Sequence, residues 1–530
     1  MSQIRVNSSP AAVSGSPGAT AGETGKRGRW LHGWEPEDPV FWEREGRGVA
    51  RRNLYASVAS EHVGFAVWSL WSVLVLFMTP ATGWATSAGD KFALTSAVTV
   101  VGALLRLPYS FAVTRFGGRN WAVFSALVLL IPVGLAAVAM GRPGAPLWVF
   151  LLCGCVAGLG GGNFASSMTN INQFFPEREK GWALGLNAGG GNLGVASVQL
   201  LGLLMAAVAG AARPELLPLL FVPLLLGSAW QAYRRMDNLA GTRTDFSSYR
   251  AVLRDRHCWI MSLLYVGTFG SFIGYSFAFG LVLQNDFGRT PTQAAALTFA
   301  GPLLGSLARP VGGRLADRFG GARVTLWTFL SMAVGAAVVL VASYTGSLAL
   351  FTTGFVVLFV LTGVGNGSTY KLIPALYAAR ARSRAEAGVE PEEARREGRR
   401  RAGAVIGVSG AVGALGGAGV NLAFRQSYET VGHARPALLA FLAFYAVCSV
   451  LTRAVYLRGP VTGAAVDATV GTERVVPAQV ITGAVIPVPV IDPPVITEPF
   501  TARPVTVPVA AESVTEPVAA ESVPDTREDA

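Results

Sequence analysis

Long apolar stretches alternate with short polar ones between about residue 61 and residue 458. A helix of about 20 apolar residues is long enough to cross the hydrocarbon core of a bilayer. Such a helix satisfies all of its backbone polar groups internally. The pattern therefore predicts an all-α membrane protein. The twelve expected membrane-spanning helices lie at 61–82, 91–114, 120–140, 146–173, 180–209, 214–233, 258–284, 291–317, 323–344, 347–378, 402–426 and 434–458.

Composition and charge support the same class. Of the 530 residues, 51% are hydrophobic and 14% are charged, whereas soluble domains have about a quarter of their residues charged. The net charge of +11 comes from basic residues that gather at 44–52, 234–256 and 380–401, all on one predicted side of the membrane. Lys and Arg accumulate in this way in cytoplasmic loops. We therefore expect a multi-pass protein of the cell membrane with both termini in the cytoplasm, and we exclude a nucleic-acid partner.

An internal repeat divides the predicted helices into two halves of six. Arg106 recurs as Arg309, 203 positions later, and each lies nine residues before an Arg-Phe-Gly-Gly turn. The same offset relates Asn163 to Asn366. Repeated halves are typical of carriers whose site lies between them, and a charge at membrane depth is costly and usually functional. We predict that Arg106 and Arg309 face one pocket for a small anion.

The composition also sets domain boundaries. A charged insert, 379–401, is expected to form a surface helix, and the Pro-rich end of the chain is expected to be a disordered cytoplasmic tail because it cannot bury a core. We expect a monomer in the lipid bilayer. The expected parts are a cytoplasmic segment 1–57, a first half 58–233, a cytoplasmic linker 234–257, a second half 258–458 and the tail 459–530.

A glycine-rich motif follows the eighth predicted helix. Gly313-x-x-x-Asp317-Arg318-x-Gly320 resembles a loop signature of the major facilitator superfamily. The resemblance implies the major facilitator fold, with Asp317 and Arg318 bracing neighbouring helices on the cytoplasmic side. The first half has Thr114 where this motif has its Asp, so we expect that half to be braced differently.

Polar residues among glycines give a narrower resemblance. The segments Gly160–Met168 and Gly185–Gly194 resemble the first nitrate signature of the nitrate/nitrite porter family, and Gly363–Thr369 resembles its second-half counterpart. Together with further motifs, the resemblance covers about 58–458. It implies a nitrate and nitrite transporter, not an enzyme, with no cofactor or metal. Asn163 and Asn366 lie in these signatures.

The resemblance also implies a substrate site. Arg106 and Arg309 would hold the anion from opposite sides, and Tyr265 and Asn192 would add hydrogen bonds. Three aromatic side chains would form apolar walls, namely Phe65, Phe164 and Phe269. The chemistry is reasonable, because a planar guanidinium can donate to two oxygens of a planar oxyanion at once.

The acidic residues indicate how transport is coupled. Proton-coupled carriers usually place a carboxylate or a histidine at membrane depth. Here the carboxylates, Glu61 and Asp317 among them, are expected at helix ends or in loops, so nitrate/nitrite antiport by alternating access is favoured. The alternatives are nitrate/proton symport through Lys371, His62 or a proton carried by the anion, a membrane sensor that does not transport, and another small oxyanion as substrate. We expect Lys371 to extend toward the cytoplasmic interface.

Overall fold

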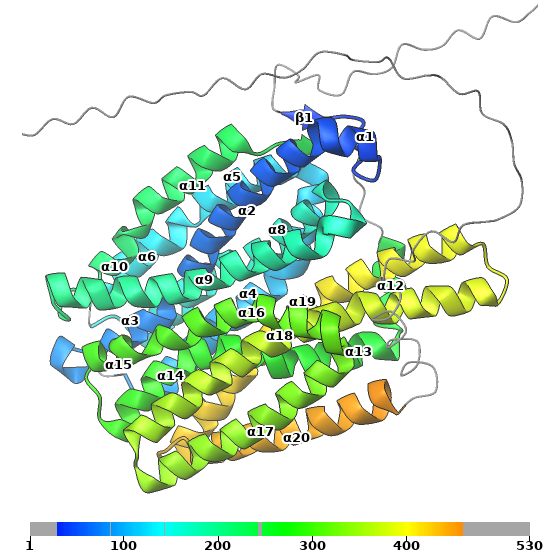
Figure 1. The fold of residues 1–530 in the computed structure, drawn as a ribbon. Helices are drawn as coiled ribbons and strands as arrows, with labels where there is room; N and C mark the ends of the chain where they lie inside the picture. Colours follow the sequence, from blue (N-terminus) through cyan, green and yellow to red (C-terminus); the bar gives the residue numbers. More distant parts are fainter. Residues whose placement is uncertain (1–28, 85, 143, 242–245, 459–530) are drawn as a thin grey trace, which may run out of the picture. The chain divides into compact units, whose positions relative to one another are not determined.

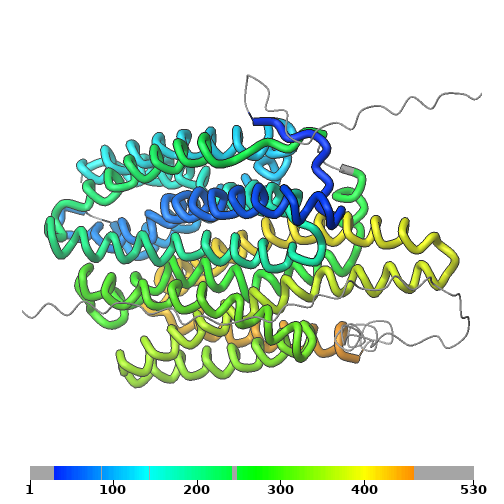
Figure 2. Tube along the Cα trace, turned by 45° about the horizontal axis from the view of Figure 1, so that its top comes forward, coloured from blue at the N-terminus to red at the C-terminus, as the bar shows by residue number. Residues whose placement is uncertain are grey.

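The structure is a computed structural model that describes residues 29–458 except 85, 143 and 242–245. In this part of the chain, eleven helices are long and apolar enough to cross a membrane. Most of them run alongside one another, as two views show (Figures 1 and 2). The tail 459–530 and residues 1–28 lie outside the described residues, so the expectation of a disordered tail stays a prediction.

The first half contains six membrane-crossing segments, several of them interrupted. The longest uninterrupted helix is α9, and it borders the second half. The elements are α2 (Arg47–Trp68) with α3 (Trp71–Phe77), α4 (Ala88–Phe116), α5 (Gly118–Val128) with α6 (Leu130–Met140), α7 (Leu147–Ala157) with the 3₁₀ turn η3 (Gly158–Gly162) and α8 (Asn163–Phe174), α9 (Glu177–Ala209), and α10 (Leu216–Leu219) with α11 (Phe221–Arg235).

The second half repeats this arrangement. Its second segment is not among the eleven apolar spans, because α16 carries Arg309, Arg314, Asp317 and Arg318. The elements are α13 (Arg256–Tyr265) with the π turn η4 (Val266–Gly270) and α14 (Ser271–Phe287), α15 (Pro291–Thr298) with α16 (Ala300–Phe319), α17 (Gly321–Thr345), α18 (Leu348–Glu386), α19 (Pro391–Val431), and α20 (Arg435–Thr452) with η5 (Arg453–Leu457).

Two expected boundaries were wrong. The first helix was expected to begin at 61, but α2 begins at Arg47 and follows directly on α1 (Pro39–Phe41) and the π turn η1 (Trp42–Gly46). The insert 379–401 is not a separate surface helix, because α18 and α19 extend through it and meet at a short turn. Backbone hydrogen bonding continues into polar sequence, whereas hydropathy marks only the part of a helix that suits lipid.

The linker and the α18–α19 turn lie at the same end of the helices, which we call the linker end (Figure 1). At this end, strand β1 (Trp30–Leu31) pairs in parallel with β2 (Asn238–Leu239). The two turns of the internal repeat also match in backbone geometry, because Gly117 and Gly320 adopt φ of +86° and +88°. A positive φ of this kind favours glycine.

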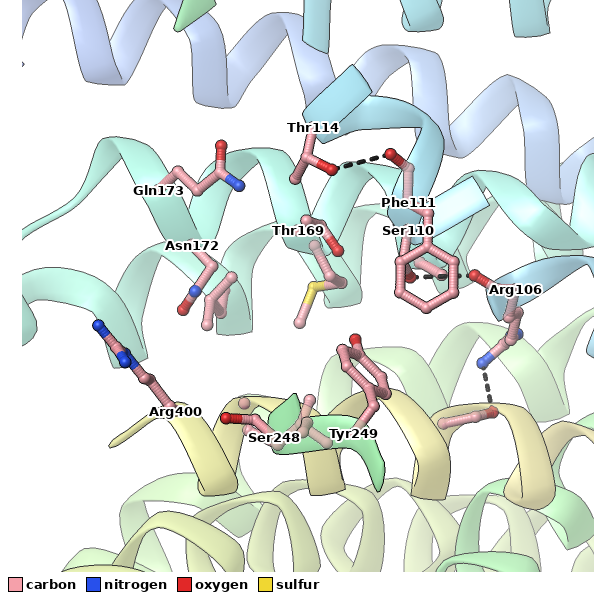
Figure 3. A pocket seen from close by; sticks show the side chains of 18 of the residues that line it. Arg106, Ser110, Phe111, Thr114, Thr169, Asn172, Gln173, Ser248, Tyr249 and Arg400 are labelled. Atoms are coloured by element: carbon pink, nitrogen blue, oxygen red, sulfur yellow. Dashed lines mark hydrogen bonds between the residues drawn. The ribbon is translucent and has the colours of Figure 1, made fainter. Parts of the chain in front are cut away.

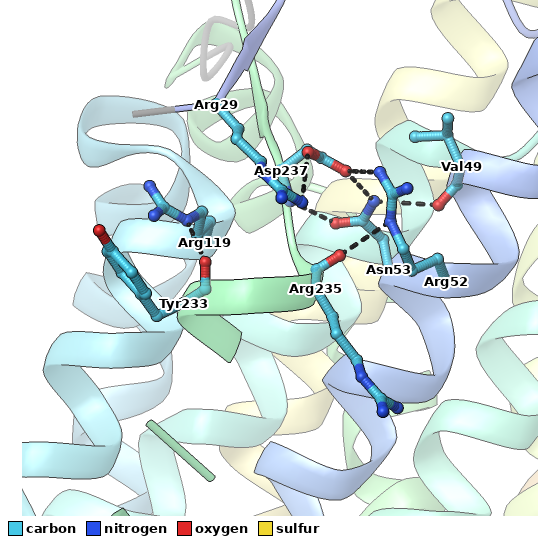
Figure 4. A network of polar contacts seen from close by, with 8 residues as sticks. All are labelled: Arg29, Val49, Arg52, Asn53, Arg119, Tyr233, Arg235 and Asp237. Atoms are coloured by element: carbon cyan, nitrogen blue, oxygen red, sulfur yellow. Dashed lines mark hydrogen bonds and ion pairs between the residues drawn. The ribbon is translucent and has the colours of Figure 1, made fainter. Parts of the chain in front are cut away.

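Each half has its own brace at the linker end. In the first half, buried Asp237 accepts hydrogen bonds from Arg52 and from Asn53 (2.9 Å), and Arg119 donates to the carbonyl of Tyr233 (2.9 Å; Figure 4). In the second half, Asp317 pairs with Lys371 at 2.8 Å. The first half is thus braced differently from the second, as expected.

Candidate anion-binding site

Two buried guanidinium groups lie against one aromatic ring. Arg106 on α4 is 1% exposed and Arg309 on α16 is 4% exposed. The Cζ atom of Arg106 lies 4.6 Å from the centre of the Phe164 ring, and the Cζ atom of Arg309 lies 6.0 Å from it. The structure therefore brings the two repeat-related arginines together, one from each half.

Hydrogen bonds occupy only part of each guanidinium. Arg106 donates from Nη1 to the carbonyl oxygen of Gly410 on α19 (2.8 Å), and Arg309 donates from Nη2 to the hydroxyl of Tyr265 (3.3 Å). Within the described part of the chain, Nε and Nη2 of Arg106 and Nη1 of Arg309 have no partner. Buried donors of this kind normally find an acceptor, and leaving them unsatisfied is costly. Three guanidinium nitrogen atoms without acceptors, on two neighbouring cations, indicate a site for an anion.

Aromatic side chains enclose the arginines. Tyr265 stacks on Phe269 with ring centres 5.2 Å apart, Phe269 stacks on Phe164 at 6.0 Å, and Phe65 meets Phe164 at 5.8 Å. All four aromatic residues implied by the sequence thus lie in one cluster. Aromatic rings of low polarity disfavour water, and hydrogen bonds to an anion held among them would be stronger for that reason.

Two further aromatic residues in the cluster were missed. The Tyr370 ring lies 5.1 Å from Cζ of Arg309 and 5.1 Å from the Tyr265 ring. The Trp68 ring lies 5.7 Å from Cζ of Arg106. The sequence position of each residue could have indicated that it belongs to the cluster. Tyr370 directly follows the second-half signature, and Trp68 lies one helical turn after Phe65.

The three predicted asparagines are buried, but no hydrogen bond joins them to either arginine among the described residues. Asn192 on α9 leaves its Oδ1 atom unsatisfied there. Asn163 fits against Gly64, where an added Cβ would come within 2.2 Å of Nδ2. Asn366 lies beside Gly367, which packs on the carbonyl oxygen of Arg309. Asn163 and Asn366 thus lie where helices of the same half pack closely on each other.

A cavity of about 250 Å³ runs from Arg106 toward the linker end, and Arg309 lies beside it without lining it. Its lining runs from buried Arg106 past Ser110 and Asn172 to the exposed Arg399 and Arg400 (Figure 3). Hydroxyl and amide groups alternate with apolar side chains along this route. The wall offers hydrogen bonds to an ion that has lost part of its hydration shell.

Contacts between the halves seal the opposite side of the arginine pair. Gln199 donates to the carbonyl oxygen of Ser276 (2.9 Å), and Gln284 donates to that of Leu76 (2.8 Å). The ring of Phe92 stacks on that of Phe424 with centres 5.6 Å apart. The central cavity thus opens toward the linker end, and contacts between the halves close the other side.

Comparison with known proteins decides the family. Residues 62–421 match the model of the Major Facilitator Superfamily. The chain is 39% identical over 452 residues to the nitrate/nitrite transporter NarU of Salmonella typhimurium, which covers 81% of this chain and 96% of that relative. The chain belongs to the nitrate/nitrite porter family of the major facilitator superfamily. As a member of this superfamily, the porter is a multi-pass membrane transporter and not an enzyme.

Other relatives agree with this assignment. The porter is 38% identical to NarU of Escherichia coli over 81% of this chain and 96% of the relative. It is 35% identical to the probable nitrate/nitrite antiporter NarK2 of Thermus thermophilus, over 74% and 88%. Among solved structures, a bacterial homologue of the lysosomal transporter Spinster, facing inward and unoccupied, has a TM-score of 0.54 at 13% identity, over 79% of this chain and 98% of that one. This last likeness shows the fold alone.

One acidic residue of the porter was misplaced by the sequence analysis. Glu61 was expected at a helix end, yet it lies inside α2, one turn before Phe65, and is 1% exposed. Its Oε2 atom accepts hydrogen bonds from Ser167 on α8 and from Asn187 on α9 (2.7 Å). The expected position of Glu61 at a helix end is therefore wrong, because the first helix begins well before its apolar stretch.

Lys371 has a partner that the sequence did not name, and Arg318 differs from expectation. The Nζ atom of Lys371 pairs with Asp317 at 2.8 Å and 3.0 Å, which joins α16 and α18 at the linker end. Lys371 does not line the cavity. Asp317 thus links α16 to α18. The guanidinium of Arg318 lies 5.1 Å from the ring of its own neighbour Phe319. That contact stays inside α16, and the described residues show no bridge from Arg318 to another helix.

Proposed function

We propose that this porter exchanges nitrate and nitrite across the cell membrane, with one anion bound between Arg106 and Arg309. The main support for this proposal is the set of buried guanidinium nitrogen atoms that have no hydrogen-bond partner. They belong to two cations on opposite halves of the molecule, against one aromatic ring. Relatives at 35–39% identity that are named nitrate/nitrite transporters support these anions as substrates. Another small oxyanion remains the alternative substrate.

The site suits a small planar oxyanion. Each guanidinium offers coplanar donors that match two oxygens of one anion. Tyr265 contacts Arg309 directly and would keep its fork oriented. Phe164 and Phe269 lie against Arg106 and would form the apolar walls. The asparagine Asn192 could turn its free amide oxygen or nitrogen to the cavity in another state of the carrier. The site is complete within one chain, so we propose a monomer.

The direction of the cavity fits alternating access. Basic residues concentrate at the linker end, which would be cytoplasmic by the positive-inside rule, together with both termini. The cavity in this structure would then face the cytoplasm. In the opposite state, the contacts of Gln199 and Gln284 would open, and the pair Asp317–Lys371 would help α16 and α18 to move as one body.

Exchange follows from the charge of the site. Two buried cations are costly to move through the membrane without an anion. A bound anion offsets part of that cost, so the loaded carrier reorients more readily than the empty one. The name of the Thermus thermophilus relative supports antiport. The absence of a buried carboxylate no longer supports it, because Glu61 is buried.

Counterflow in proteoliposomes tests the proposal. Purified porter is placed in vesicles loaded with nitrite, and uptake of labelled nitrate is followed at equal pH on both sides. We expect rapid uptake that requires internal nitrite or nitrate. A panel of small monovalent oxyanions as internal anions distinguishes the alternative substrates. A membrane sensor that does not transport would show no uptake above protein-free vesicles, and that result would contradict the proposal.

A further inference from the structure

We propose that Glu61 is a proton-binding site that is coupled to the anion site, so that the porter can also carry one proton inward with one anion. This inference rests on the proposed function, because it assigns the anion to the pair Arg106 and Arg309. It adds a proton to that cycle. Exchange then becomes one part of a larger cycle that also allows net uptake.

Glu61 lies in a built polar cluster. Ser167 and Asn187 donate to the Oε2 atom of its carboxylate. The Oε1 atom has no hydrogen-bond partner among the residues that the structure describes. It lies where Gly191 has no side chain, since a Cβ there would come within 2.2 Å of Oε1. The cluster leaves one carboxylate oxygen buried and free to receive a proton.

No basic side chain forms an ion pair with Glu61 within the described part of the chain. The charged groups that act on it at longer range are Arg309 and Arg106. The other titratable neighbour is His62 on the same helix, and its Nδ1 atom is engaged with the carbonyl of Gly190 (3.0 Å). The helices α8 and α9 present only uncharged groups to Glu61, such as Ser167 and Asn187. Among charged groups, the two arginines are therefore the ones that act on its charge, in addition to burial and the hydrogen bond from Ser167.

This arrangement links the two binding events. In the empty carrier, the arginines favour the ionised carboxylate, because opposite charges attract. An anion between the arginines cancels part of their field, and a second negative charge nearby becomes unfavourable. Anion binding therefore promotes proton binding to Glu61, and by thermodynamic linkage proton binding promotes anion binding to the same degree.

Charge balance shows what the proton changes. The empty carrier with ionised Glu61 holds two arginine charges and one carboxylate charge, which leaves one net positive charge. The carrier with a bound monovalent anion and a protonated Glu61 also holds one net positive charge. The empty carrier can therefore return across the membrane about as readily as the loaded one. Net uptake requires the empty carrier to return across the membrane. Exchange does not require this step, because the carrier is loaded in both directions.

A small cavity beside Glu61 offers the proton a way out. It has a volume of about 20 Å³ and is lined by Ser57, Glu61, Ser167 and Asn170, and it reaches Gly118 and Met236 near the linker end. A cavity of this size has room for about one water molecule. Ser57 and Ser167 are hydrogen-bonded to each other at 3.0 Å. The proton taken up by Glu61 would leave by this route, separate from the anion cavity.

The test compares net uptake with exchange in the same vesicles. Wild-type porter should take up labelled nitrate into vesicles that contain neither nitrate nor nitrite when the outside is acidic. Glu61→Gln, which keeps the size of the side chain but cannot ionise, should reduce this uptake by on the order of tenfold or more and should retain nitrate/nitrite counterflow. His62→Gln and Glu215→Gln serve as matched controls and should behave like wild type. Glu215 is half-buried and pairs with Arg213 at 3.3 Å.

Binding provides a second measurement that needs no transport. Titration of nitrate into purified porter in two buffers of different ionisation enthalpy counts the protons taken up with the anion. We expect net proton uptake for wild type and none for Glu61→Gln. Three results would overturn the inference: acid-driven uptake that survives in Glu61→Gln, its absence in wild type, or the same proton count in both proteins. Loss of exchange in wild type would instead contradict the proposed function.

Discussion

Arg106 reaches from the first half of the molecule to the second, where its Nη1 atom donates to the carbonyl oxygen of Gly410 at 2.8 Å. Gly410 lies on α19, and a Cβ there would stand 3.8 Å from the same nitrogen. The contact leaves Nε and Nη2 of Arg106 free in the described structure. One guanidinium thus joins the halves and still offers donors to an anion between them.

Tyr265→Phe tests how the second arginine is positioned. The Tyr265 hydroxyl accepts a hydrogen bond from Arg309 (3.3 Å), and the ring stacks on Phe269. Phe keeps the ring and removes only the oxygen. A hydrogen bond to a charged group contributes roughly 1.5–3 kcal/mol, so nitrate should bind about tenfold more weakly. Titration calorimetry measures the Kd, and Tyr344→Phe, at an exposed position, is the control. Equal affinity in Tyr265→Phe would show that the hydroxyl does not orient Arg309.

Lys371→Gln tests the brace between α16 and α18. Its ion pair with Asp317 is partly exposed, with side-chain exposures of 42% and 58%. Exposed pairs contribute about 0–1 kcal/mol, and Lys371 does not line the anion cavity. We expect nitrate affinity within about twofold of wild type and unchanged acid-driven uptake. Loss of acid-driven uptake in Lys371→Gln, with exchange retained, would move the proton site from Glu61 to Lys371.

Asp255 predicts a pH dependence of stability. It caps α13 and accepts hydrogen bonds from Tyr377 (2.7 Å) and Arg380. Burial alone would raise the pKa of Asp255, but the hydrogen bonds from Tyr377 and from the backbone of His257, together with the charge of Arg380, hold it below the ordinary value of 3.8. A lowered pKa means that this stabilisation is present above the ordinary value and is lost as the pH falls through the lowered one.

The variant Asp255→Asn should therefore have a Tm a few degrees below wild type at neutral pH. The difference should shrink as the pH falls below about 4, because the wild-type carboxylate then becomes protonated. Thermal unfolding in detergent at several pH values measures it. A gap in Tm that is the same at acidic and neutral pH would show that the charge of Asp255 does not stabilise the fold.

The fold was predictable because the apolar stretches mark the membrane-spanning helices and the internal repeat divides them into two halves. Each span must satisfy its backbone inside lipid, and the repeat places Arg106 and Arg309 at equivalent depth. Because charge at that depth is costly, the sequence alone was enough to single out the two arginines as candidates for an anion pocket. The aromatic neighbours Phe164 and Phe269 came from the family resemblance, since an apolar residue in an apolar helix has no signal of its own.

Other features depended on geometry that the sequence does not show. Glu61 was placed at a helix end, because the apolar stretch begins beside it while the helix itself begins at Arg47. Which helix face a residue occupies depends on the packing of its neighbours, so the position of Tyr370 beside Arg309 was not visible. Lys371 pairs with Asp317 and so joins α18 to α16. The motif around Asp317 implied a contact with another helix but did not show that Lys371 is its partner.

The most direct test of the central claim replaces each buried arginine with lysine and measures nitrite-driven counterflow of labelled nitrate. Lysine keeps the charge but lacks the planar fork. Arg106→Lys and Arg309→Lys should each lower the apparent affinity for nitrate about tenfold to a hundredfold, with normal insertion and thermal stability. Arg115→Lys, at an exposed position on the same helix as Arg106, should transport like wild type. Counterflow at wild-type rates and affinities in both buried-arginine variants would show that this pair does not hold the anion.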